Sequence, residues 1–86
     1  MGKSLISSPT LEKLLAAMSM QDGAEYSVEW HEHLRSYRFI GRKRIDGEPM
    51  IYSAFVQEEH VDEVGPGNAF MGMRDRAILA LFKGSV

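Results

Sequence analysis

The spacing of apolar residues along the chain first predicts a helix. Between residues 9 and 22, apolar positions recur at intervals of three and four, the period of one helical face, at Leu11, Leu14, Leu15 and Met18. Ser8 is a suitable N-cap, and Pro9 suits the first helical position because its missing N–H would have no helical partner there. Gly23 favours the left-handed conformation that ends many helices. We therefore predict a first helix over residues 9–22.

From residue 24 onward the apolar period falls to two, which is typical of β-strands. The first strand places apolar residues on one face at Tyr26, Val28, Trp30 and Leu34. A tight turn at Arg35-Ser36 and a hairpin turn at Asp46-Gly47 then separate two further strands. The apolar rows of these strands are Tyr37, Phe39, Gly41 and Ile45, followed by Met50, Tyr52, Ala54 and Val56.

Helical spacing returns over residues 69–83, with a broad apolar face at Phe70, Met73, Ala77, Ile78, Leu81 and Phe82. Asn68 suits the N-cap of this helix, Lys83 suits its negative end, and Gly84 marks its stop. The acidic stretch 57–67 lies between the third strand and this helix, and we predict that it is a loop.

These segments predict a single small α+β domain over residues 1–86, in the order α-β-β-β-α. A first turn of two residues places Trp30 opposite Gly41, and in the same register Glu29 lies opposite Arg42. We expect a three-stranded antiparallel meander with two helices packed on one face. That arrangement buries the row of large aromatic side chains on the inner face, which is formed by Tyr26, Trp30, Phe39 and Tyr52.

This order of elements resembles that of the double-stranded-RNA-binding domain, with EYSVEW, YRFIGRKRIDGE and the closing helix in corresponding places over about residues 9–83. In that family a pair of lysines opens the second helix and grips phosphates across the major groove. The matching stretch of this chain reads Asn68-Ala69-Phe70-Met71-Gly72-Met73. Because topology alone does not carry RNA binding, we assign no family.

The composition excludes several classes of protein. The chain has 86 residues, a formal net charge of −2 and no cysteine, which excludes a disulfide scaffold, a thiolate zinc site and a cysteine nucleophile. No run approaches the roughly 18 apolar residues of a membrane span, and the start MGKSLISSP lacks the apolar core of a signal peptide. We therefore expect a cytoplasmic protein without a membrane partner. A domain this small is modestly stable alone, which favours a second copy or a partner.

Basic charge is concentrated in the middle of the chain, where residues 35–56 contain five basic and two acidic side chains. The second strand places a row of three arginines on its outer face, Arg38, Arg42 and Arg44. Arg35 and Lys43 lie nearby. Guanidinium groups match phosphate oxygens, so this row is a candidate nucleic-acid contact. The alternative is a solvated face on which the arginines form ion pairs with Glu25 and Glu29.

Three apolar residues alternate onto the same outer face: Ile40, Ile51 and Phe55. Outward apolar residues among charges mark protein contacts more often than nucleic-acid grooves. We therefore predict a small non-enzymatic interaction module that binds a protein partner, or itself as a homodimer, through these residues and the three arginines. The alternative function is a nucleic-acid-binding domain that uses the arginine row.

Two other groups of residues are candidates for chemistry. His31 and His33 lie two apart beside Glu29, but a zinc site usually needs a fourth ligand and supporting hydrogen bonds, and only His60 in the acidic stretch is an obvious further donor. We predict no metal site and no cofactor. The segment Gly65-Pro66-Gly67-Asn68 lacks the lysine and spacing of a phosphate-binding loop and is predicted to be a turn.

No catalytic residue is predicted, because the chain has neither a Gly-x-Ser-x-Gly nor a His-Glu-x-x-His motif. The acidic stretch has two interpretations. The first is a solvated loop that keeps the edge of the third strand from pairing. The second is a functional surface, which either contacts a basic partner or imitates nucleic-acid charge toward an enzyme that grips phosphates, through Glu58, Glu59, Asp62 and Glu63.

Overall fold

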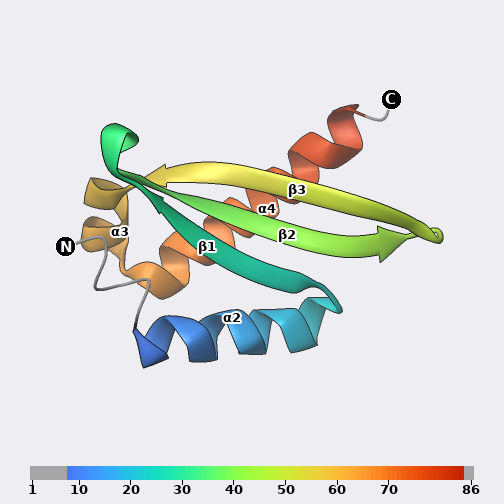
Figure 1. Cartoon of the computed structure of the whole chain (residues 1–86), viewed down its shortest axis with the longest axis horizontal. Coiled ribbons are helices and arrows are strands. Elements are labelled where there is room, and N and C mark those ends of the chain that lie inside the picture. The colour runs from blue at the N-terminus through green and yellow to red at the C-terminus, as the bar shows by residue number, and fades with distance from the viewer. Residues whose placement is uncertain (1–7, 85–86) are drawn as a thin grey trace.

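The computed structural model describes residues 8–84. Three strands form one antiparallel sheet in the order β1-β2-β3, and the element order α-β-β-β-α-α confirms the predicted α+β class. Along the chain the elements are α2 (Pro9–Asp22), β1 (Glu25–His31), a 3-10 turn (Glu32–Leu34), β2 (Ser36–Ile45), β3 (Glu48–Gln57), α3 (Glu58–Val64) and α4 (Pro66–Gly84), as drawn in Figure 1.

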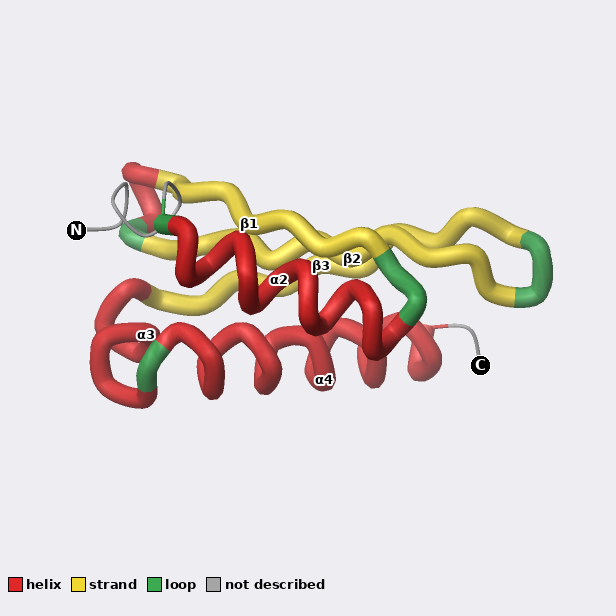
Figure 2. Tube along the Cα trace, turned by 90° about the horizontal axis from the view of Figure 1, so that it is seen from below, coloured by secondary structure: helices red, strands yellow, loops and turns green. Residues whose placement is uncertain are grey.

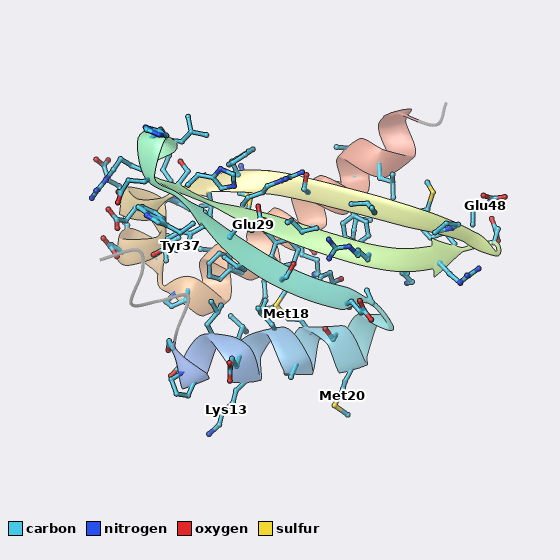
Figure 3. The ribbon with its side chains drawn as sticks, viewed as in Figure 1. Lys13, Met18, Met20, Glu29, Tyr37 and Glu48 are labelled. Carbon is cyan, nitrogen blue, oxygen red and sulfur yellow. The ribbon has the colours of Figure 1, made fainter. Side chains whose placement is uncertain are left out.

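Helix α2 has the predicted bounds because both of its ends are capped locally. The Ser8 hydroxyl accepts a hydrogen bond from the backbone N–H of Thr10 at 3.1 Å, and Pro9 is the first helical residue. Gly23 adopts φ 65° and donates its N–H to the carbonyl of Ser19 at 2.8 Å. Met18 is buried toward the sheet, whereas the side chain of Met20 points away from it (Figure 3).

The two long helices cover one face of the sheet, as predicted (Figure 2). Helix α2 contacts β1, and α4 contacts β2 and β3. The most deeply buried large side chains are Phe39, Phe70 and Met73. The ring of Phe70 lies 5.8 Å from that of Tyr37 and 6.4 Å from that of Phe39, between ring centroids. Phe70 therefore joins α4 to the central strand.

The connection between β1 and β2 differs from the expected two-residue turn. Strand β1 ends at His31, and a 3-10 turn followed by Arg35 at φ 47° leads into β2. Trp30 consequently lies opposite Tyr37 rather than Gly41, so the predicted register is wrong by four residues. Side chains alternate between the two faces of a sheet, so a shift by an even number of residues leaves each side chain on the predicted face. Leu34 lies on the turn and is exposed.

Arg35 holds this turn in place through contacts that are distant in sequence. Its guanidinium donates to the carboxylates of Glu32 at 3.3 Å and Glu58 at 2.7 Å, and it lies 5.7 Å from the centroid of the Trp30 ring. The Arg35 carbonyl also accepts the N–H of Glu58 at 3.0 Å. The longer turn is therefore stabilised by the start of α3, which local spacing does not reveal.

Gly41 lies beneath two tyrosine rings at one end of the inner face. It pairs with Tyr26 on β1 and Tyr52 on β3, and a Cβ atom at this position would lie 2.7 Å from Tyr52 Cζ and 2.8 Å from Tyr26 Cε1. The Tyr26 hydroxyl donates to Asp22 at 2.5 Å and lies 3.1 Å from the Tyr52 hydroxyl, and Arg74 donates to the same carboxylate at 3.3 Å. Burial and the hydrogen bonds raise the pKa of Tyr26. The network thus ties α2, β1, β3 and α4 together.

The prediction of an acidic loop over residues 57–67 is wrong, because most of this stretch forms α3. Val61 is buried and Val64 packs against the core, so two apolar residues three positions apart hold the helix to the domain. Burial, together with the charges of Glu58 and Asp62, raises the pKa of Tyr37. Acidic side chains therefore project from an ordered helix.

Helix α4 begins at Pro66, three residues before the predicted start, and ends at the predicted Gly84. Pro66 suits a first helical position because it lacks an N–H. Asn68 consequently lies inside the helix instead of capping it, and its side-chain amide donates to the carbonyl of Val64 at 3.0 Å. The predicted roles of the Phe82 and Lys83 side chains lie outside the described residues.

Candidate functional site

The outer face of the sheet carries a different type of residue on each strand. The register places acidic side chains on β1, arginines on β2 and large apolar side chains on β3. Among residues 8–84, no helix covers this face (Figure 1). Three rows cross it from β1 to β3: Glu25, Arg42 and Ile51; Ser27, Ile40 and Ser53; Glu29, Arg38 and Phe55.

The arginines on this face differ in how they are held. Arg38 Nη1 lies 3.8 Å from Glu29 Oε1, and its Nη2 donates to the Ser53 hydroxyl at 3.4 Å. Arg44 donates to the carbonyl of Gly47 at 3.0 Å. Arg42 lies between Glu25 and Ile51 and is exposed. The predicted pairing of Glu29 with Arg42 is thus replaced by Glu29 with Arg38.

The three predicted apolar contact residues are all on the outer face but differ in exposure. Ile51 is 62% exposed and Phe55 is 48% exposed, whereas Ile40 is only 4% exposed. Ile40 belongs to the central strand, where neighbours on both sides cover it. The apolar surface offered to a partner is therefore concentrated on β3.

His31 has a role on this face that the sequence pattern did not indicate. Its ring lies 5.3 Å from the Phe55 ring in an edge-to-face arrangement, and its Nε2 lies 3.2 Å from Glu29 Oε1. The two residues come from the two edge strands, His31 opposite Ser36 and Phe55 opposite Arg38, so their rings meet over β2. The Phe55 ring is therefore supported in one orientation.

The structure separates the histidines considered as metal ligands. His33 lies on the 3-10 turn rather than beside His31 on β1, and His60 lies on α3. Within residues 8–84, no group of three or more His, Cys, Asp or Glu side chains is arranged to hold a metal ion.

A shallow depression of about 590 Å³ lies at the end of the sheet nearest the Asp46-Gly47 turn, and residues of both faces line it. It forms because β2 and β3 extend beyond the start of β1, so the last turn of α2 and residues 42–44 and 49–51 meet around it. The depression brings Arg42, Arg44 and Ile51 together. Sequence reasoning missed it, because it depends on where α2 ends relative to the hairpin.

No family model, curated protein or solved structure matches the chain. The helices formed within residues 8–84 include none with both the length and the apolar composition needed to cross a membrane.

Proposed function

We propose that the domain is a non-enzymatic interaction module that binds a protein, either a different chain or a second copy, through the outer face of its sheet. The observation that carries the proposal is the exposure of Ile51 and Phe55 on a sheet face that no described element covers. Exposed apolar residues surrounded by polar ones mark interaction sites. The proposal includes a cytoplasmic location, which cell fractionation tests.

The surroundings of Phe55 support this function. Arg38 and Glu29 provide a polar rim beside the apolar strand, an arrangement common in protein interfaces, where Phe and Arg are enriched. Because the His31 ring already holds Phe55 in one orientation, binding loses less side-chain entropy. Phe55 is thus a preorganised anchor.

Phe55→Asp is expected to weaken partner binding at least about tenfold, because the new carboxylate loses its hydration in the interface. The measurement uses a chain in which photoreactive benzoylphenylalanine replaces Ile51. Irradiation in cells is expected to give a protein adduct of defined mass, and Phe55→Asp is expected to remove it.

Position 20 provides the matched control, because Met20 is 87% exposed and points away from the sheet (Figure 3). The photoreactive group placed there is expected to give no such adduct, and Met20→Asp is expected to preserve the adduct formed at position 51. Equal labelling from positions 20 and 51, or none from 51, would contradict the proposal.

Nucleic-acid binding is the second candidate function, and the exposure of Arg42 and Arg44 around the depression favours it. If these residues bind phosphates, Arg42→Glu with Arg44→Glu abolishes binding to duplex or single-stranded nucleic acid, and the wild-type affinity falls steeply with added salt. Fluorescence anisotropy at low salt measures both effects. Lys13→Glu is the control, because Lys13 projects from α2 away from the sheet (Figure 3). Absence of wild-type binding at low salt would exclude this function.

A further inference from the structure

We propose that two copies of the domain join their β3 strands edge to edge, antiparallel, about a two-fold axis at Ser53, to form one six-stranded sheet. The inference rests on the proposed function, since it names the partner as a second copy and gives the way it docks. Strand β3 is an edge strand of ten residues. In Figure 1 the described elements leave its outer side open, with α4 in the layer behind it.

The backbone hydrogen-bonding groups of β3 alternate in the way that this pairing requires. Asp46 and Gly47 have φ values of 53° and 81°, which fit a two-residue type I′ turn, and such a turn closes on a hydrogen-bonded pair, here Ile45 and Glu48. The backbone N–H and C=O groups of the even-numbered β3 residues therefore bond to β2. The hydrogen bond from the Glu58 N–H to the Arg35 carbonyl follows the same alternation. The odd-numbered residues direct their N–H and C=O groups toward the open edge.

These odd-numbered residues include the exposed apolar pair of the outer face. A two-fold axis at Ser53 places Ile51 opposite the partner's Phe55, and Phe55 opposite the partner's Ile51. Cross-strand apolar neighbours of this kind stabilise sheets. The same register places Gln57 opposite the partner's Pro49, so the missing proline N–H falls at the end of the ladder, where it costs least. With Ile51 at the centre, Phe55 would lie opposite the partner's Gly47, and with Phe55 at the centre, Ile51 would lie opposite the partner's Glu59, so only the axis at Ser53 gives both residues an apolar neighbour.

Charge complementarity supports the same register. Arg76 of α4 and His60 of α3 line a hollow at the β3 edge together with Phe55, Val56 and Gln57. Glu48 points to the helix side and is exposed near the hairpin tip (Figure 3). In the antiparallel pair the partner's Glu48 lies opposite Glu58, whose carboxylate is already bound by Arg35, and beside the hollow that Arg76 and His60 line. Arg76 is then the positively charged group available to the partner's Glu48 at each end of the interface.

Disulfide trapping tests the axis directly, because the chain has no cysteine of its own. In the proposed pair the two Ser53 Cα atoms are about 5.5 Å apart, within the range that a disulfide spans. Ser53→Cys is expected to form a covalent dimer under mild oxidation. Ser27→Cys is the matched control, since Ser27 lies in the same row of the outer face but on β1, and it is expected to remain monomeric.

Charge exchange tests the register independently. Arg76→Glu is expected to raise the dimer dissociation constant about tenfold, through like-charge repulsion with the partner's Glu48. The double variant with Glu48→Arg and Arg76→Glu is expected to recover the wild-type dissociation constant. Analytical ultracentrifugation provides the constants, with Arg74 left unchanged because it belongs to the Asp22 network.

The outcomes separate the failure of this inference from that of the proposed function. Equal disulfide formation from Ser27→Cys and Ser53→Cys would indicate face-to-face stacking, and would overturn the edge pairing while the outer face remained a binding surface. A monomeric Ser53→Cys chain whose position-51 adduct contains a different protein would also overturn only the inference. A monomeric chain without any position-51 adduct would overturn both.

Discussion

Phe70→Ala is expected to lower the free energy of unfolding by about 3–5 kcal/mol, the usual cost of removing a fully buried phenylalanine ring. Phe70 is 0% exposed, and its ring packs against both Tyr37 and Phe39, so its removal opens a cavity between α4 and the sheet. A domain of this size is stabilised by roughly 4–13 kcal/mol in total. The variant is therefore expected to lose a large part of its stability and to unfold at a lower temperature than the wild type.

Urea denaturation followed by the fluorescence of the single tryptophan, Trp30, measures this loss. Leu79→Ala is the matched control, because Leu79 lies on the same helix but is 62% exposed. It is expected to change the free energy of unfolding by less than about 0.5 kcal/mol. Similar losses in the two variants would show that Phe70 does not join α4 to the sheet.

Gly41→Ala is expected to lower the free energy of unfolding by about 2–4 kcal/mol, although it adds a single methyl group. That methyl group would lie within 2.8 Å of the Tyr26 and Tyr52 rings, which are held by the hydrogen bond from Tyr26 to Asp22 and by the hydrogen bond between the two tyrosine hydroxyls. To make room, the rings must move and weaken these bonds. Gly41 does not have a positive φ angle, so the expected loss comes from the added side chain and not from backbone strain.

The chain offers an opposite control in Gly72, which lies inside α4 with open space around its Cβ position. Gly72→Ala is expected to raise the free energy of unfolding by about 0.5–1 kcal/mol, because alanine loses less backbone entropy in a helix. Thermal and urea denaturation compare the two variants. A Gly41→Ala variant as stable as the wild type would show that the tyrosine pair adapts freely.

The candidate site was predictable in part. Strict alternation along β2 and β3 correctly placed Ile51, Phe55 and the arginines on the outer face, because neighbouring side chains of a strand point to opposite sides. The pattern did not show that Ile40 is buried, since burial within a sheet depends on neighbours from both flanking strands. It also did not bring His31 to Phe55, because the two residues belong to different edge strands.

The parts of the fold that the sequence determined by itself are those held by contacts over a few residues. The capping of α2 by Ser8 and Gly23, and the left-handed turn at Asp46-Gly47, need only local hydrogen bonds and backbone preferences. The inner rows of the strands follow in the same way from a period of two. Elements with strong local signals were therefore predicted with their correct bounds or faces.

Only the tertiary structure decided the β1–β2 connection, the helix in the acidic stretch and the partners of the arginines. The turn before β2 depends on Arg35 reaching Glu58, 23 residues away in sequence. Helix α3 is too short to be stable alone, and packing of Val61 and Val64 against the core holds it. In each case the deciding energy comes from groups that meet only after the chain has folded, so a local pattern cannot contain it.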